Sequence, residues 1–226
     1  MAERVDEEPW PWVPPPTGPG GPGLPGPEPL ADVVARRLLA QRVVLLHGPL
    51  DELSVTRVAA ELMTLDADGD DPVTLRVDCG EAGLAPALTL MDVVELMGVP
   101  VRALCLGQVA GGAVGVVAVC DHRSALPSTR FSLCEPATQL QAHVRNVAQW
   151  VELHAAERRR FCERIGAAAG RAADAVEVDL DRGRFLGAEE AVAYGILDEV
   201  SRPDAAIRPL RGGGGGQPPM GFRPLR

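Results

Sequence analysis

One stretch near the middle of the chain, residues 101–120, limits the possible folds most strongly. It opens with an apolar run of strand length, Val101–Leu106, passes a predicted turn at Gly107–Gln108, and continues as a predicted helix of small residues, Ala110–Val119. In α/β proteins such a turn places one residue at the helix N-terminus, where backbone N–H groups can hold an oxyanion. A serine at this turn would indicate a hydrolase, but residue 111 is a glycine.

Two strand–helix pairs precede this stretch. Apolar runs predict strands at 42–46 and 73–77, and helical spacing of apolar residues predicts helices at 52–66 and 84–97. Strand–helix repeats in series favour a mainly parallel sheet with right-handed crossovers, so the sequence predicts an α/β fold. Sites in such sheets lie at the carboxyl ends of strands, here near Asp78, Gly107–Gly111 and Cys134.

The second half of the chain predicts short strands at 124–126 and 130–133 and a long helix, Thr138–Ala169, that Gly170 ends. A capped helix over 187–195 and a strand at 197–200 follow. Apolar residues in the first half of the long helix recur at spacings of three and four, which predicts an oligomer interface. The alternative is that the helix folds back and the stripe is core. The stripe comprises Leu140, Val144, Val147, Trp150, Val151 and Leu153.

The ends of the chain differ in composition from the middle. Residues 1–29 are rich in Pro and Gly and are expected to form a disordered arm, and residues 204–226 a flexible tail, leaving one domain over residues 30–203. Trp10 and Trp12 in the arm are either a docking segment for a partner or incidental aromatics.

Composition excludes several classes of function. The net charge is −9, and an acidic chain is a poor candidate for nucleic-acid binding. Every Lys or Arg position is an Arg, which rules out a Schiff-base or catalytic lysine. No apolar run approaches membrane-spanning length and no signal peptide is evident, so we expect a cytoplasmic protein without membrane contact. The five scattered cysteines favour buried thiols, and neither a metal nor a cofactor is expected.

Three segments carry a family resemblance. Cys105–Ala113 resembles the Gly-Gln-Ala-Ala-Ser-Met-Gly-Ala segment of Clp protease proteolytic subunits, Asp181–Val200 resembles their Asp-Arg-Phe-Leu block, and Leu46–Asp51 resembles their opening strand and turn. The resemblance covers about residues 38–200. It implies the ClpP/crotonase-like fold, with a handle helix at 138–169 that projects and interleaves across stacked heptameric rings, and serine endopeptidase activity driven by a Clp ATPase.

The residues that carry this activity in the family are all replaced. Alignment of the motifs places the family's serine on Gly111, its histidine on Cys134 and its aspartate on Gly183. The oxyanion-loop positions become Glu81 and Ala82, together with Gly112 after the turn (the Glu81 carboxylate would repel a developing negative charge). The resemblance therefore implies a pseudoprotease: a structural or regulatory subunit in a homo- or hetero-oligomer with active Clp peptidase subunits, and possibly with an AAA+ Clp ATPase, in protein quality control.

Two other chemistries stay open at this point. Cys134 could be a nucleophile with His122 as its base, although a packed thiol is the simpler interpretation. The glycine-rich turn also resembles crotonases, acyl-CoA enzymes that polarise a thioester carbonyl with backbone N–H groups, and Glu135 is then the candidate acid. The other histidines stand alone in the sequence and are interpreted as structural or exposed: His47, His143 and His154.

Overall fold

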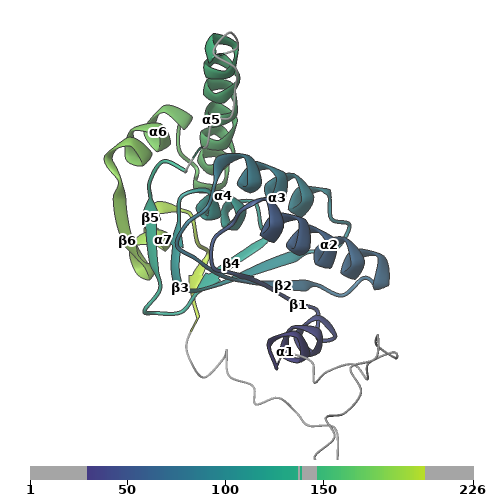
Figure 1. Cartoon of the computed structure of the whole chain (residues 1–226). Coiled ribbons are helices and arrows are strands. Elements are labelled where there is room, and N and C mark those ends of the chain that lie inside the picture. Colours follow the sequence, from purple (N-terminus) through teal and green to yellow (C-terminus); the bar gives the residue numbers. More distant parts are fainter. Residues whose placement is uncertain (1–29, 137, 139–146, 202–226) are drawn as a thin grey trace, which may run out of the picture.

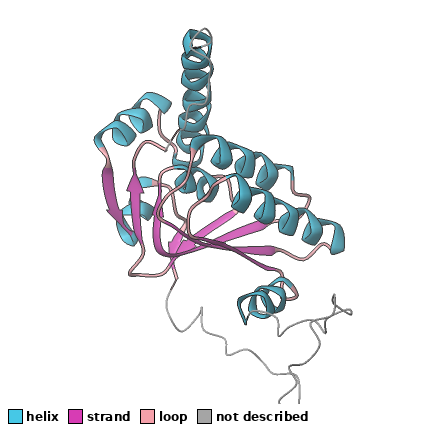
Figure 2. Cartoon of the chain, viewed as in Figure 1, coloured by secondary structure: helices cyan, strands magenta, loops and turns pink. Residues whose placement is uncertain are grey.

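The computed structural model describes residues 30–136, 138 and 147–201, and the arm and the tail lie outside this part of the chain (Figure 1). Leu140, His143 and Val144 also lie outside the described residues. The described residues form a seven-stranded, mainly parallel sheet with helices packed against it (Figure 2). The predicted α/β fold is thereby confirmed.

The first half alternates helices and strands as the sequence predicts. Asp51 caps α2, where its side chain accepts a hydrogen bond from the Ser54 backbone N–H at 2.9 Å. Figure 1 shows α2 and α3 above one face of the sheet, with α1 below it near β1. The elements are α1 (Leu30–Leu39), β1 (Val43–His47), α2 (Glu52–Asp68), β2 (Val73–Cys79), α3 (Leu84–Leu96) and β3 (Val101–Ala110).

The long strand β3 joins two parts of the sheet. Its first half pairs with β4 (His122–Ala125), and its second half pairs with β5 (Arg130–Leu133). The predicted turn at Gly107–Gln108 is wrong: the strand continues to Ala110 through an irregularity in its pairing with β2. There the Asp78 side chain accepts a hydrogen bond from the Gln108 backbone N–H at 3.1 Å, which replaces the interrupted ladder.

The remaining elements extend the sheet on both sides of this branch. Strand β7 pairs with β4 in parallel, whereas β6 pairs with β5 in the one antiparallel pairing among the described strands. The sequence predicts no helix between the long helix and residue 187, but α6 occupies most of this interval and ends at Gly183. The elements are α4 (Gly112–Ala118), α5 (Val147–Ala169), α6 (Ala173–Arg182), β6 (Arg184–Gly187), α7 (Ala188–Tyr194) and β7 (Glu199–Val200).

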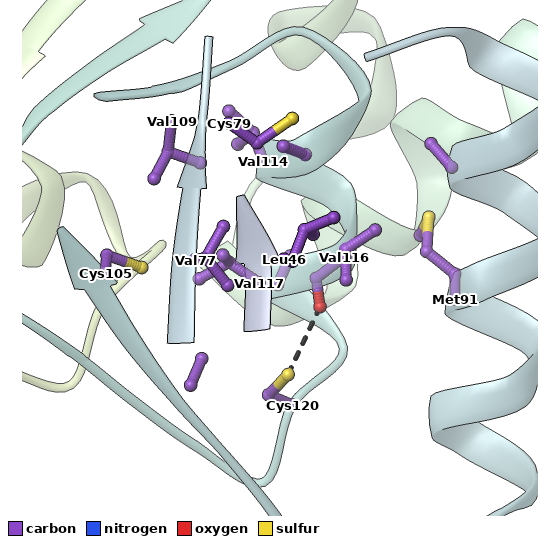
Figure 3. Close-up of a cluster of buried hydrophobic side chains, with 14 of the residues drawn as sticks. Leu46, Val77, Cys79, Met91, Cys105, Val109, Val114, Val116, Val117 and Cys120 are labelled. Atoms are coloured by element: carbon purple, nitrogen blue, oxygen red, sulfur yellow. Dashed lines mark hydrogen bonds between the residues drawn. The ribbon is translucent and has the colours of Figure 1, made fainter. Parts of the chain in front are cut away.

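The core lies between the sheet and the helices that pack on it, and Figure 3 shows the part of it next to helices α3 and α4. Aliphatic residues dominate it, as the low aromatic content requires, and four of the five cysteines are buried in it. All five cysteines are free thiols. The Cys120 Sγ donates to the Val116 carbonyl at 3.3 Å, and burial raises the pKa of this thiol to about 12, so it stays protonated at neutral pH.

Helix α5 has two distinct halves. At its base Phe161, Cys162 and Ile165 are buried against the domain. The Phe161 ring packs so closely over Gly115 of α4 that a Cβ at residue 115 would overlap it. The first turns of α5 rise above the domain (Figure 1). Packing at the base therefore fixes the direction in which the rest of the helix projects.

Candidate functional site

Gly111 occupies the turn between β3 and α4. Its φ of 57° and ψ of −127° lie in a region that residues with a side chain rarely adopt. Its backbone N–H donates to the Ser132 carbonyl of β5 at 3.2 Å, which holds the turn against the neighbouring strand. This is the sharp strand-to-helix turn that holds a nucleophile in many hydrolases.

Cys134 lies beside this turn. A Cβ placed on Gly111 would lie 3.9 Å from the Cys134 Sγ and 3.6 Å from the Pro136 Cα. The reason is that β5 pairs with the second half of β3, so the two strands end at the same edge of the sheet. A side chain at residue 111 would therefore point toward residue 134, and the structure brings these two positions together.

Gly183 is the third position that was aligned with the family's catalytic residues, after Gly111 and Cys134. It follows α6 in a left-handed conformation and directly precedes Arg184, which pairs with Leu133 at the end of β5. Residues 183 and 134 therefore each lie one residue beyond the last pair of the β5–β6 ladder, at the same end. A Cβ at residue 183 would meet no atom within 4 Å, so the position is open.

The backbone amide that follows the turn is already occupied. The Gly112 N–H donates to the carbonyl oxygen of Ala82 at 3.3 Å, and the same oxygen would lie 3.3 Å from a Cβ on Gly111. An oxyanion would need the Gly112 N–H as a free donor. The Ala82 carbonyl oxygen, whose partial negative charge repels an anion, occupies the place that the oxyanion would take. Sequence reasoning missed this feature because the direction of a peptide group leaves no residue signature.

The loop that contains Ala82 is held by hydrogen bonds to Leu50, in the turn that follows strand β1. The Leu50 N–H donates to the Glu81 carbonyl at 2.8 Å, and the Gly83 N–H donates to the Leu50 carbonyl at 3.2 Å. The Glu81 side chain is exposed, so the group that faces the Gly112 amide is the carbonyl of Ala82 and not the carboxylate of Glu81. These bonds hold the Ala82 peptide in its present orientation.

The Cys134–His122 pair is not formed. Residue 102 of β3 pairs with His122, whereas residue 110, eight residues further along the strand, pairs with Ser132. At about 3.3 Å per residue, His122 and the end of β5 are roughly 25 Å apart. His122 lies on β4 rather than after a helix, and it faces Asp198 and Glu199 at 3.5 and 3.4 Å.

Glu135, the acid that a crotonase-like reaction would need, is engaged in an ion pair. The Arg158 Nε lies 3.4 Å from its carboxylate, and Arg158 also pairs with Glu177 and Asp181 of α6. This arginine ties the base of α5 to α6 and to the loop after Cys134. The sequence offers a signal for it in the run Arg158–Arg160, but it does not indicate which arginine turns inward.

The other histidines have defined surroundings. His47 faces Asp78 at 3.4 Å, and His154 stacks on Trp150 with ring centroids 5.0 Å apart. Within residues 30–136, 138 and 147–201, no cluster of three or more His, Cys, Asp or Glu could hold a metal ion. In the same part of the chain, no helix combines the length and the apolar character needed to cross a bilayer.

The branched parallel sheet and the strand–turn–helix site define an α/β protein built around a hydrolase-type turn that lacks a nucleophile. The model of the Clp protease family matches residues 28–204, which is more than half of the chain. The chain therefore belongs to the Clp protease family.

Individual relatives agree with this assignment. The ATP-dependent Clp protease proteolytic subunit 1 of Corynebacterium diphtheriae is 31% identical over 170 residues, which cover 73% of this chain and 80% of the relative. Subunit 2 of Thermobifida fusca is 29% identical over 178 residues, 76% of this chain and 87% of the relative. Subunit 1 of Corynebacterium glutamicum is 30% identical over 172 residues, 73% of this chain and 81% of the relative.

Proposed function

We propose that this chain is a catalytically degenerate Clp proteolytic subunit, a structural or regulatory member of a Clp peptidase ring in the cytoplasm. It assembles with active Clp peptidase subunits or with further copies of itself, and the complete ring docks an AAA+ Clp ATPase. The relatives are named proteolytic subunits of an ATP-dependent protease, which supports the link to such an assembly.

One observation carries the loss of activity. The three positions that match the family's triad, Gly111, Cys134 and Gly183, lie together at one edge of the sheet and hold no hydroxyl, imidazole or carboxylate. Serine proteolysis needs a nucleophile, a base that takes its proton and a carboxylate that orients the base. The strand-to-helix turn at Gly111 thus supports a site that has the backbone of a hydrolase without the side chains that would react.

The occupied amide supports the same conclusion independently. Even a nucleophile introduced from outside would generate an oxyanion beside the Ala82 carbonyl, because the Gly112 N–H already donates to that oxygen. Losing one oxyanion donor costs about 100-fold to 1,000-fold in turnover in other serine hydrolases.

The assembly role rests on α5. Trp150 is half-buried, and Val147 and Val151 on its projecting half are 37% and 54% exposed. Exposed apolar stripes of this kind are typical of protein interfaces. Leu140 and Val144, which the sequence places on the same stripe, lie outside the described residues.

The test is native mass spectrometry of the chain co-purified with an active Clp proteolytic subunit that retains Ser, His and Asp. The proposal expects mixed rings of defined stoichiometry, with peptide turnover proportional to the number of active subunits. A turnover higher than the active subunits alone account for would show that the chain itself cleaves peptides. Failure to join any ring, together with a monomeric mass on its own at high concentration, would contradict the assembly role.

A further inference from the structure

The tail that follows the domain carries the same short motif twice. Residues 207–211 read Ile-Arg-Pro-Leu-Arg and residues 222–226 read Phe-Arg-Pro-Leu-Arg, and the four-residue motif Arg-Pro-Leu-Arg occurs at no other place in the sequence. Proline fixes its own φ and favours an extended residue before it, so each motif favours an extended segment with an arginine on either side of Pro-Leu. Such a segment suits a site that offers apolar surface between carboxylates.

The charge of the tail is opposite to that of the domain. Residues 202–226 contain five arginines and one acid, whereas residues 30–201 contain 16 arginines and 25 acids. The arm, residues 1–29, contains five acids and one arginine. Charge complementarity therefore favours the tail, and not the arm, as the segment that binds an acidic part of the domain.

A pocket of about 340 Å³ lies at the edge of the sheet where β3 and β4 begin. Ligand pockets measure ~300–1,000 Å³, so this one suits a few residues of extended chain. The apolar part of its lining includes Met97, Val99, Pro100 and Val119, and carboxylates come from Glu95 and Asp121.

Both carboxylates of the pocket retain capacity for a basic partner. Asp121 accepts a hydrogen bond from the Val101 N–H at 2.8 Å through Oδ2, and no ion pair of the described residues includes it. Glu95 pairs with Arg164, but the same guanidinium also pairs with Asp92. One arginine thus serves two carboxylates, which leaves the α3 side of the pocket acidic.

A third carboxylate lies behind the pocket wall. Asp66 Oδ1 accepts hydrogen bonds from the N–H groups of Gly98 and Val99 at 2.9 and 3.1 Å, and Asp66 forms no ion pair within the described part of the chain. Arg102 follows Pro100 by two residues but does not line the pocket. The pocket therefore combines apolar surface with negative charge, as the motif requires.

The tail begins within reach of this pocket. The Ser201 N–H donates to the Ala125 carbonyl at 2.8 Å, and Asp121 precedes Ala125 by four residues. At about 3.3 Å per residue, this interval is roughly 13 Å long. The six residues 202–207 can span up to about 20 Å before the first arginine of the motif. The first motif can therefore reach the pocket of its own chain.

We propose that the pocket binds the first Arg-Pro-Leu-Arg motif of the tail of the same chain. Leu210 enters the apolar part, and Arg208 and Arg211 pair with the carboxylates of Asp121 and Glu95. The identical motif at residues 223–226 can replace the first, which keeps the pocket filled. This inference depends neither on the loss of catalysis nor on the assembly role proposed above.

A weak contact is sufficient because the motif is tethered to the domain. Short linkers give effective concentrations on the order of 1 mM. A motif with a dissociation constant of ~100 μM as a free peptide would therefore occupy about 90% of the pockets when tethered. Because the contact depends on charge pairs at the surface, salt should weaken it.

The experiment compares the original full chain with a full-length tail variant that combines Arg208→Ser, Arg211→Ser, Arg223→Ser and Arg226→Ser. A labelled peptide, Ile-Arg-Pro-Leu-Arg-Gly, is titrated into each protein and followed by fluorescence anisotropy. We expect the tail variant to bind the peptide with a dissociation constant of ~100 μM and the original chain to bind it about tenfold more weakly, because its own tail competes. A peptide of the same composition in scrambled order should not bind.

Variants of the pocket locate the contact. In the tail variant, Glu95→Gln with Asp121→Asn should weaken peptide binding at least about tenfold, because the amide oxygens keep the existing hydrogen bonds and carry no charge. The matched control is Asp174→Asn with Glu189→Gln, which removes the same charge from exposed positions on α6 and α7 and should leave binding unchanged. Circular dichroism checks that all variants fold alike.

Hydrogen–deuterium exchange provides a second measurement that needs no change in the pocket. Residues 94–101 should exchange up to about tenfold faster in the tail variant than in the original chain, in proportion to the lost occupancy. Equal exchange, equal affinity of the two proteins for the peptide, or equal binding of the scrambled peptide would overturn the proposal. Competition that grows with protein concentration would assign the pocket to the tail of a second copy and would also contradict binding within one chain.

Discussion

At the scale of single residues, Gly111 meets two requirements at once. Its backbone needs a positive φ, and the Ala82 carbonyl approaches within 3.3 Å of the place where a Cβ would be. We therefore expect Gly111→Ser to lower the free energy of unfolding by about 1–3 kcal/mol and to restore no peptide hydrolysis, because base and orienting carboxylate stay absent. Urea denaturation and a fluorogenic peptide assay check the two parts.

The triple variant Gly111→Ser, Cys134→His and Gly183→Asp extends this prediction. It should assemble a triad at converging positions yet turn over poorly, because the Gly112 N–H still donates to the Ala82 carbonyl. The single variant is its control. Substantial activity from Gly111→Ser alone would mean that the base and the carboxylate lie elsewhere in the chain.

Asp198 provides a residue-scale prediction about acid. Hydrogen bonds from Arg123, including one from its backbone N–H at 2.7 Å, lower the pKa of this carboxyl below 3.8. A carboxyl whose folded pKa is lowered stabilises the fold above its ordinary pKa, and this contribution disappears as the pH falls through the folded value. Asp198→Asn should thus be less stable than the original chain at pH 7 and should lose less stability on acidification below about pH 4.

The matched control for this variant is Asp68→Asn, which makes the same substitution at an exposed position at the end of α2. Melting temperatures between pH 3 and pH 7 should follow the original chain for Asp68→Asn and diverge from it for Asp198→Asn. Parallel curves for all three proteins would show that the Arg123–Asp198 contact contributes nothing measurable.

At the scale of elements, the base of α5 is predicted to hold the handle in place. Phe161 is 0% exposed and packs over Gly115, so Phe161→Ala should cost about 3–5 kcal/mol in urea denaturation. Leu153→Ala, eight residues earlier on the same helix, removes a largely exposed side chain and should change the stability by less than about 0.5 kcal/mol. Equal costs for the two variants would contradict the division of α5 into an anchored base and a free upper half.

Most helices and strands, but not all, could be predicted from the sequence. Apolar runs and helical spacing located the helices and strands from β1 to β3, because each of these elements buries a regular set of apolar side chains. Helix α6 was missed because only Val176 and Leu180 of its ten residues are buried, too few to stand out among its charges. The extension of β3 was missed because Gly107 and Gln108 read as a turn, whereas the Asp78 carboxylate, distant in sequence, carries the strand past them.

The candidate site was also predictable only in part from the sequence. The sequence placed residues 111 and 134 at the carboxyl ends of strands, and parallel topology brings the ends of β3 and β5 to one edge. Gly183 reaches this edge through the antiparallel strand β6, which the sequence did not predict. The group that faces the turn was not predictable. The sequence directed attention to the Glu81 carboxylate, and the structure places the Ala82 carbonyl there, because backbone orientation depends on the Leu50 pairing and not on residue type.

At the scale of the whole molecule, assembly through α5 should depend on which face of the helix is changed. Trp150→Glu puts a charge in the stripe and should dissociate the complex while the chain keeps its helical circular dichroism and cooperative melt. Ala156→Glu introduces the same charge on the exposed opposite side of the helix and should leave the assembly intact. If both variants dissociate, or if Trp150→Glu unfolds the chain, the stripe is not the interface.

Loss of catalysis is tested by intact-mass spectrometry of the chain after exposure to a serine-reactive fluorophosphonate. We expect that the purified protein gains no mass and cleaves no fluorogenic peptide, while an active Clp proteolytic subunit treated in parallel gains one adduct per chain. A stoichiometric adduct on any serine of this chain, accompanied by peptide cleavage, would contradict the loss of catalysis.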